Sequence, residues 1–365
     1  MSALEERKQA LRAAGKTLHD FGLGDPMEPT PEFLRQALRD AVPEVSQYPS
    51  AQGTPALRRA CAGYLERRFG VRVDPDRQVL PATGAKETIF HLPLAFAGGT
   101  RRKVVMPDPG YPTYEAGTRF AGLEPIKIPL GEHNRFLLEP EALGEAVLAE
   151  TLLFWICYPH NPTGAVATRA YLGRVGEAAR RHGFIVVSDE CYADIYFGER
   201  PASMLEVQVE NVLAIHSCSK RSGMTGYRSG FLAGDPDLVA VLRRMRSHPG
   251  VASPDFVSAA ATAAWSDDAH AAARRERFGE KRERFLRFFA AHGLEVHASE
   301  AGLYLWVKVP RGHTSGSYAA ALLEEGVVVA PGTAFGAGEG YVRVALAPAL
   351  EACDAACAAW ARVKT

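Results

Sequence analysis

Residues 151–192, with the sequence TLLFWICYPHNPTGAVATRAYLGRVGEAARRHGFIVVSDECY, decide the fold class of this chain. An apolar run of strand length lies at 151–157, a second lies at 184–188, and an amphipathic stretch separates them. Two buried strands that flank such a stretch form the βαβ unit of a parallel sheet. This part of the sequence therefore predicts an α/β fold.

The same alternation continues on both sides of this unit, from about residue 55 to residue 248. Further apolar runs of strand length occupy residues 78–81, 103–107, 124–129, 212–216 and 230–233. Together the runs predict a three-layer large domain around a mainly parallel, seven-stranded sheet. Ligands of such sheets bind beyond the carboxyl ends of the strands. We therefore expect the chemistry in the loops at 83–87, 108–114, 158–164, 189–192 and 217–228.

The pattern changes after the predicted sheet. One long charged helix is predicted over 267–292, and short strands are predicted at 303–309, 327–330 and 341–346. These elements indicate a second, smaller α+β domain. We expect a large domain over 42–275 and a small domain built from both chain ends, 1–41 and 276–365. A helix at about 31–41 is expected to pack on the small domain, because it precedes the sheet and needs an apolar partner.

Composition excludes several classes of protein. The 365 residues contain 42 Lys and Arg against 42 Asp and Glu, and 47% of them are hydrophobic, which is typical of a folded protein. A nucleic-acid binder needs uncompensated basic clusters, so no nucleic-acid partner is expected. The longest apolar run, 152–158, is far shorter than the ~20 residues of a membrane span, and residues 1–20 lack the layout of a signal peptide. The sequence predicts a cytoplasmic protein without a membrane partner.

The six cysteines form no CxxC pair and no even framework. Neither a zinc site nor disulfides are therefore expected. Cys353 and Cys357, four residues apart in an Ala-rich segment, are interpreted as packing residues. No metal site is predicted.

Three short motifs stand at predicted strand ends. They are Asn161-Pro162-Thr163-Gly164, Ser188-Asp189-Glu190-Cys191-Tyr192, and Ser217-Cys218-Ser219-Lys220 with Arg228 eight residues later. Each motif alone is common in ordinary turns and helix caps. Together and in this order they closely resemble fold-type I pyridoxal-phosphate enzymes of the aspartate aminotransferase superfamily, the class I and II aminotransferases. The resemblance covers nearly the whole chain.

The resemblance implies a role for each residue around the cofactor ring. Pyridoxal phosphate needs an amine to hold its aldehyde and a carboxylate to keep its ring nitrogen protonated. Lys220 matches the amine and Asp189 the carboxylate. Asn161 and Tyr192 match the donors to the phenolic oxygen, and Tyr111 matches the aromatic residue that stacks on the ring.

The cofactor phosphate calls for a guanidinium, hydroxyls and backbone amides at a helix start. By the resemblance these are Arg228, Ser217, Ser219 and the turn Gly84-Ala85-Lys86. Tyr48, before Pro49, resembles the tyrosine that reaches the phosphate of the neighbouring subunit. A homodimer with shared active sites is therefore expected.

The substrate end of the site is less specific in sequence. Arg343 matches the arginine that binds the substrate α-carboxylate, Asn161 is expected to assist it, and the backbone of Gly24 matches the loop that closes over the substrate. Residues 220–231 look most like succinyldiaminopimelate aminotransferases of lysine synthesis. The best guess for the reaction is transfer between glutamate and N-succinyl-2-amino-6-oxopimelate. Arg246 and His248 are the candidates for contact with a distal carboxylate, and an exposed basic helix end explains them equally well.

Two alternatives stay open at this point. Aspartate and broad-specificity aminotransferases share most of the motif at residues 220–231. A carbon–sulfur β-lyase would use the same lysine, aspartate and arginine but expel a group from the β-carbon.

Overall fold

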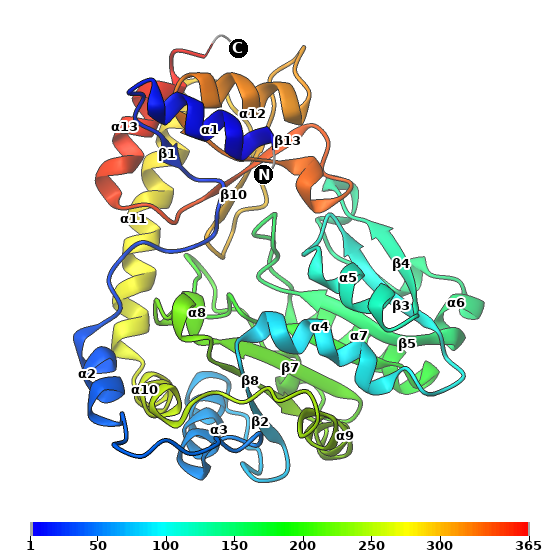
Figure 1. The fold of residues 1–365 in the computed structure, drawn as a ribbon. Coiled ribbons are helices and arrows are strands. Elements are labelled where there is room, and N and C mark those ends of the chain that lie inside the picture. The colour runs from blue at the N-terminus through cyan, green and yellow to red at the C-terminus, as the bar shows by residue number, and fades with distance from the viewer. Residues whose placement is uncertain (1–2, 364–365) are drawn as a thin grey trace.

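The computed structural model describes residues 3–363 and contains one large central sheet (Figure 1). Its seven strands run in the order β2-β8-β7-β6-β5-β3-β4. The strands are β2 Val79–Ala82, β3 Lys103–Asp108, β4 Glu124–Pro129, β5 Thr151–Cys157, β6 Ile185–Asp189, β7 Val212–Ser217 and β8 Gly230–Gly234. Strand β8 is antiparallel to both of its neighbours and the other pairings are parallel. The predicted mainly parallel, seven-stranded sheet is confirmed.

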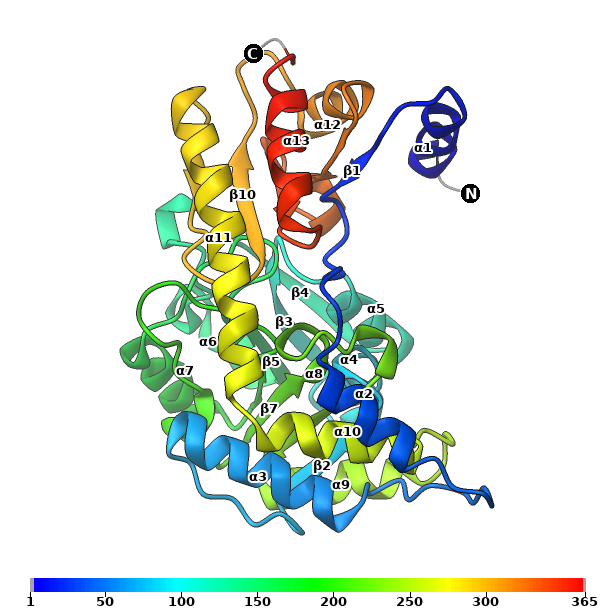
Figure 2. The ribbon, with the colours of Figure 1, turned by 90° about the vertical axis from the view of Figure 1, so that its left-hand side faces the viewer.

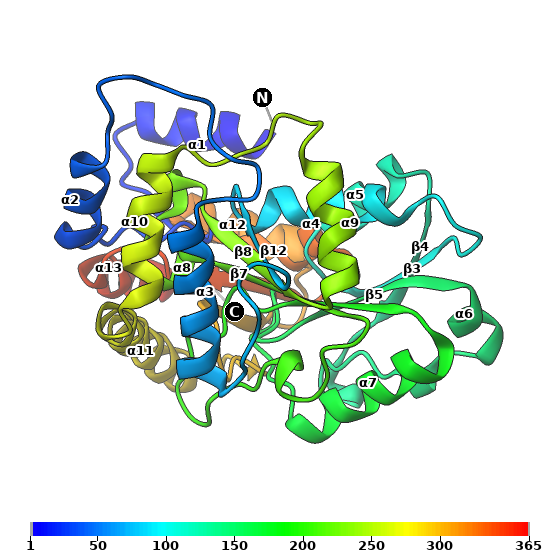
Figure 3. The ribbon, with the colours of Figure 1, turned by 90° about the horizontal axis from the view of Figure 1, so that it is seen from below.

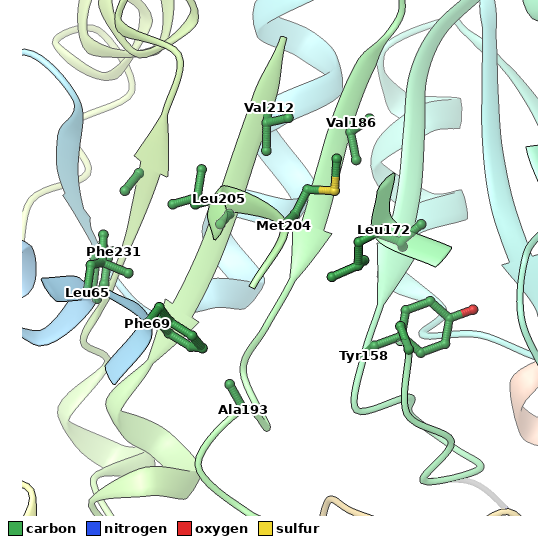
Figure 4. Packing of buried hydrophobic residues seen from close by; sticks show 14 of the residues in the cluster. Leu65, Phe69, Tyr158, Leu172, Val186, Ala193, Met204, Leu205, Val212 and Phe231 are labelled. Atoms are coloured by element: carbon green, nitrogen blue, oxygen red, sulfur yellow. The ribbon is translucent and has the colours of Figure 1, made fainter. Parts of the chain in front are cut away.

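Strand β5 is covered on both faces, which explains why its sequence is apolar from Leu152 to Cys157. Leu153 and Trp155 face a cluster with one set of helices, whereas Phe154 and Ile156 face a cluster with the other set. A strand covered on both faces needs apolar residues at every position. The first set is α4 Ala85–Phe96, α5 Thr113–Phe120 and α9 Pro236–Arg246; the second is α3 Pro55–Phe69, α7 Arg169–His182 and α10 Asp255–Ser266. The view along the sheet shows the three layers (Figure 3), and a close view shows part of the second cluster, including Phe69, Leu172 and Met204 (Figure 4).

A long helix, α11 Ala269–Ala291, leads from the sheet to a separate apolar core (Figure 2). That core is built on a four-stranded antiparallel sheet, ordered β12-β13-β10-β9, and on a two-stranded parallel sheet of β1 and β11. The elements are β1 His19–Asp20, β9 Val296–His297, β10 Tyr304–Lys308, α12 Ser315–Glu324, β11 Val327–Val328, β12 Ala330–Pro331, β13 Tyr341–Ala345 and α13 Leu350–Trp360. The predicted long helix and the smaller α+β unit are both present.

Two helices of the amino-terminal segment lie apart from each other. Helix α1 Ala3–Ala13 ion-pairs with α12 through Arg7 and Glu324. Helix α2 Glu32–Asp40 packs instead on α10, and its buried Leu34 belongs to the core of the large sheet (Figure 2). The expectation that the helix at 31–41 packs on the small domain is therefore wrong. Its apolar stripe finds a partner on α10, which an amphipathic pattern does not name in advance. The predicted boundaries at 42 and 275 stay a prediction.

No helix within residues 3–363 is both long and apolar enough to cross a bilayer. The same residues contain no group of three or more His, Cys, Asp or Glu side chains placed to hold a metal ion. All six cysteines are free. Cys353 is buried in the small core and Cys357 packs against it, as their interpretation as packing residues requires.

Candidate active site

The loops that follow the large-sheet strands meet residues from the small sheet around a cavity of about 410 Å³. Twelve of the residues predicted for the site line it. They are Gly24, Ala85, Lys86, Tyr111, Asn161, Asp189, Tyr192, Ser217, Ser219, Lys220, Arg228 and Arg343. A larger cavity, about 730 Å³, lies between the end of α3 and the start of α7, but none of the predicted site residues lines it. Chemistry therefore points to the smaller cavity.

Lys220 lies on a single helical turn, α8 Cys218–Arg221, directly after β7. Its ammonium donates to the carbonyl oxygen of Gly24. Burial lowers the pKa of Lys220 to about 8, aided by the positive charges of Arg228 and Arg343 and opposed by Asp25. The fold thus makes an unusually large share of this amine neutral near physiological pH, as a nucleophilic or proton-moving lysine requires.

Asp189 ends β6 and points a buried carboxylate into the cavity. Its Oδ2 accepts from the Tyr114 hydroxyl at 2.7 Å and its Oδ1 from the Cys191 backbone amide at 3.2 Å. Burial raises the pKa of Asp189 despite these bonds. No cationic side chain in the described part of the chain forms an ion pair with it. A positively charged ligand group opposite this carboxylate would supply the missing partner.

Arg228 lies beside the start of α4. The helix begins after Gly84, whose φ of +79° places it in the left-handed region. A Cβ at this position would overlap the Arg228 guanidinium, so only glycine lets the helix amides and the arginine share one cradle. Ser217 and Ser219 line the same cavity, and the Ser217 hydroxyl caps α8 by accepting from the Ser219 amide at 3.1 Å. A guanidinium, hydroxyls and a helix amino-terminus together suit a phosphate.

Arg343 comes from β13 and is almost fully buried. Its Nη1 donates to Asn161 Oδ1 at 2.9 Å and its Nη2 to the Gly22 carbonyl at 2.9 Å. The rings of Tyr304 and Phe335 each lie 4.2 Å from the guanidinium carbon. Its Nε has no acceptor among residues 3–363. The predicted contact between Asn161 and Arg343 is present, and the guanidinium retains donor capacity for an anion in the cavity.

Three residues that contact the predicted site residues were not anticipated. Tyr304 lies on β10, where Trp306 pairs with Arg343 and Tyr304 with Ala345, so Tyr304 is a diagonal neighbour of Arg343. Its hydroxyl lies 3.0 Å from that of Tyr192. Phe335 covers Arg343, and Tyr114 bonds Asp189. Tyr114 follows Tyr111 by three residues, so helical spacing around the loop at 108–114 was the available signal.

The two candidates for distal recognition are not where they were expected. Arg246 is buried, donates to the Pro81 carbonyl at 2.7 Å and lies 3.3 Å from the Glu87 carboxylate. His248 is exposed, and neither residue lines the cavity of its own chain. Within this chain Arg246 is thus directed to Pro81 and Glu87 and away from the cavity, and a distal contact for either residue stays a prediction. Tyr48 is fully exposed and also lies outside this cavity.

The residues present fit pyridoxal phosphate. The cradle of Gly84 and Arg228 matches the phosphate. Lys220, with its lowered pKa, matches the aldehyde, and the Asp189 carboxylate, which has no ion-pair partner among the described residues, matches the protonated ring nitrogen. Arg228, Lys220 and Asp189 all line one cavity, which is large enough for a small cofactor with an amino acid.

Comparisons with known proteins agree with this chemistry. The family model described as aminotransferase class I and II matches residues 16–359. The chain is 38% identical over 343 residues to an LL-diaminopimelate aminotransferase of Dehalococcoides mccartyi, covering 92% of this chain and 88% of that protein. It is 37% identical over 351 residues to the enzyme of the same name from Aquifex aeolicus, covering 94% and 90%.

Solved structures agree as well. A probable N-succinyldiaminopimelate aminotransferase from Thermus thermophilus superposes with a TM-score of 0.92 and 29% identity, covering 99% of this chain and 98% of that one. The family-model match, residues 16–359, includes all three sheets and every residue that lines the cavity. The chain therefore belongs to the class I and II aminotransferases, enzymes that depend on pyridoxal phosphate.

Proposed function

We propose that this aminotransferase uses Lys220 as its catalytic base and acts on a diaminopimelate-type amino acid with 2-oxoglutarate as the acceptor. Pyridoxal phosphate, when bound, supplies an electron-accepting ring that stabilises negative charge on the substrate α-carbon. The roles below concern what the side chains of this chain do around that group.

Lys220 would hold the cofactor aldehyde, give way to the incoming amino group and then take the proton from the α-carbon. Its lowered pKa, about 8, supports this role, because a base must be neutral to accept a proton. Asp189 would keep the ring nitrogen protonated. Tyr114 would hold the Asp189 carboxylate in place through the 2.7 Å hydrogen bond.

The phosphate would be held by Arg228, Ser217, Ser219 and the amides of the turn Gly84-Ala85-Lys86. Tyr111 would lie against the ring, and Tyr192 and Asn161 would reach its phenolic oxygen. Burial raises the pKa of the Tyr192 hydroxyl well above its ordinary value, which keeps it a donor.

Arg343 would bind the substrate α-carboxylate. The surroundings of its guanidinium are the observation that carries the proposal. Two aromatic rings and two hydrogen bonds fix its guanidinium while leaving Nε without an acceptor. Gly24 would close over the same end of the substrate. Gly24 belongs to the segment 22–31, which we call the strap. A Cβ on Gly24 would overlap the Tyr304 hydroxyl, so the close approach of the strap to Tyr304 requires glycine.

The names of the curated relatives support LL-diaminopimelate as the amino donor. Its distal end carries both an ammonium and a carboxylate, so neutral hydrogen-bonding groups can hold it. An N-succinyl substrate, by contrast, has no distal ammonium and carries two distal carboxylates, one on the carbon chain and one on the succinyl group, so it needs a basic partner. Arg246 does not line the cavity, and Lys86 at the rim is the lining cation that remains for such a contact.

N-Succinyl-2-amino-6-oxopimelate stays the second candidate. The motif at residues 220–231 and the likeness to the Thermus thermophilus structure favour it. Aspartate or a broad range of amino acids is the remaining aminotransferase alternative.

A panel of amino donors tests the substrate. We expect kcat/KM with 2-oxoglutarate, measured as glutamate formed, to be highest for LL-diaminopimelate. A preference for the N-succinyl compound in the reverse direction, lost in Lys86→Ala, would select the second candidate. The highest kcat/KM for leucine or phenylalanine would refute both. Release of pyruvate and ammonia without an oxo acid would indicate the β-lyase instead.

A homodimer with Tyr48 reaching the neighbouring subunit and a cytoplasmic location both remain predictions. The complete exposure of Tyr48, with Val42 and Val45 exposed in the same loop, supports the dimer.

A further inference from the structure

The helical turn that carries Lys220 is too short to hold itself in place. Helix α8 contains four residues, Cys218–Arg221, and a single turn has an unfavourable nucleation free energy. The position of Lys220 must therefore be set by contacts that α8 makes with its surroundings. The residue that makes most of them is its immediate neighbour, Arg221.

Arg221 is 4% exposed, and every nitrogen of its guanidinium has an acceptor. Its Nε donates to Asp194 Oδ2 at 2.7 Å, and its Nη1 donates to the Ala264 carbonyl at 2.6 Å. Its Nη2 donates to the Asp267 carbonyl at 2.9 Å and to Asp268 Oδ1 at 2.7 Å. A planar group bound in several directions has one permitted position.

Two adjacent aromatic rings also pack against the same guanidinium. The centroids of Tyr64 and Trp265 lie 5.0 and 5.1 Å from its central carbon. The side chain thus contacts α3 through Tyr64 and α10 through Trp265, both of which pack on the large sheet.

Asp194 belongs to the loop that leaves β6 with Asp189 and Tyr192. Besides Arg221 it accepts from Arg68 Nε at 2.9 Å and from the Tyr64 hydroxyl at 3.1 Å. Burial opposes its ionisation, but the charges of Arg221 and Arg68 hold the pKa of Asp194 below its ordinary value. The carboxylate is therefore an anion across the physiological range.

We propose that the Arg221–Asp194 ion pair is a positioning clamp for catalysis. It ties the residue next to Lys220 to the loop that carries Asp189 and Tyr192, and so fixes the lysine relative to the opposite end of the cofactor ring. A displacement of about 1 Å between reacting groups can reduce a rate roughly 100-fold. The inference rests on the role of Lys220 proposed above.

Arg67 provides a control for the possibility that Arg221 has a purely structural role. Arg67 donates to the same Asp268 at 2.8 Å and to the Trp265 carbonyl at 2.6 Å, but it lies on α3 and has no contact with Asp194 in the described structure. If only the junction of α10 and α11 needed support, the loss of either arginine would have similar consequences.

The experiment compares holoenzyme variants Arg221→Met, Arg221→Lys and Asp194→Asn with the control Arg67→Met. We expect Arg221→Met to lower kcat roughly 10- to 100-fold while the KM of the amino donor changes less than about threefold, since Arg343 is untouched. The pH at which the absorbance of the Lys220-bound cofactor changes should also shift. Arg221→Lys should recover only part of kcat, because an ammonium cannot make all four bonds. Arg67→Met should leave kcat and the spectrum as they are.

The double variant Arg221→Met with Asp194→Asn covers the case in which a single variant fails to fold, because it removes both charges of the pair. Arg68, the other cation at Asp194, keeps its hydrogen bonds to the Ala193 and Pro201 carbonyls. The kcat of the double variant should be no lower than that of either single variant, as expected of residues that act as a unit. Wild-type kcat and an unshifted spectrum in the Arg221 variants, or equal losses in Arg67→Met, would overturn the clamp. Full activity of Lys220→Ala would instead overturn the proposed base.

Discussion

At the scale of single residues, the site depends on charges that the fold leaves partly uncompensated. Lys220, Asp189 and Arg343 are each withdrawn from water, and each lacks a full set of partners within the described residues. Burying a charge in this way costs stability unless a ligand completes its bonds. The same cost is a source of binding free energy when cofactor and substrate enter.

The pKa of Lys220 gives a direct prediction for the enzyme without cofactor. Only the neutral amine attacks an aldehyde, so the rate of covalent attachment of pyridoxal phosphate should rise nearly tenfold per pH unit below about 8 and level off above it. Stopped-flow absorbance measures this rate. Lys86→Ala should show the same midpoint, whereas a midpoint near 10.5 would mean that burial does not lower the pKa.

Arg343→Ala should raise the KM of every amino donor, because each presents the same α-carboxylate. Removing one partner of a buried charge pair typically costs about 2–5 kcal/mol. Arg343→Lys keeps the charge but loses the two-pronged geometry. We expect its KM to lie between that of the wild-type enzyme and that of Arg343→Ala. Steady-state kinetics with two different donors measure the effect. Unchanged KM values for both would remove Arg343 from the substrate site.

At the scale of elements, one loop ties the two cores together at the cavity. Asp108, the last residue of β3, accepts from the Ala337 amide at 2.6 Å, and the Gly110 amide donates to the Phe335 carbonyl at 2.9 Å. The loop at 108–114 carries Tyr111, and the turn Gly332–Phe335 carries the ring that covers Arg343. These two bonds therefore couple the proposed cofactor side of the cavity, at Tyr111, to its proposed substrate side, at Arg343.

Asp108→Ala should loosen this connection and raise the KM of the amino donor. A hydrogen bond to a charged acceptor is worth about 1.5 kcal/mol or more, which corresponds to roughly tenfold. Asp108→Asn is the matched control, since its side-chain oxygen can still accept from Ala337. Both variants lose the ion pair with Lys127. Equal KM values in the Ala and Asn variants would show that this hydrogen bond does not contribute.

The elements that the sequence predicts well are those with a strong local pattern. The strand at 151–157 and the helix at 267–292 were placed within two residues, because apolar runs and helical spacing report directly on burial. The strand containing Tyr304 was also found, but its pairing with β13 was not, and register decides that Tyr304 and Arg343 are neighbours. A periodic pattern predicts whether a segment is a helix or a strand, but it does not predict which other element that segment packs against or pairs with. The wrong placement of α2 has the same cause.

At the scale of the whole molecule, the strap at residues 22–31 contacts both the large sheet domain and the smaller core around the cavity. It donates no catalytic side chain, yet its carbonyls accept from Arg343 at Gly22, from Lys220 at Gly24 and from Arg274 at Pro29. Thr30 in turn donates to the Gly223 carbonyl at 2.6 Å. These contacts link residues that are 193 to 321 positions apart in the sequence. Motif matching finds the lysine and the arginine, but only the fold reveals the strap between them.

The dimer is the last and largest-scale prediction, and it follows from where Tyr48 is. The residue is fully exposed and outside the cavity of its own chain, so a role at the cofactor phosphate requires a second subunit. Light scattering should give twice the mass of 39.5 kDa. Mixing Lys220→Ala and Tyr48→Phe subunits tests the crossing. If Tyr48 crosses, the mixed dimer has one site with both defects and one intact site, so its activity rises above that of either parent. If Tyr48 serves its own subunit, no intact site forms and the activity cannot exceed that of Tyr48→Phe. A fully active monomer would exclude shared sites altogether.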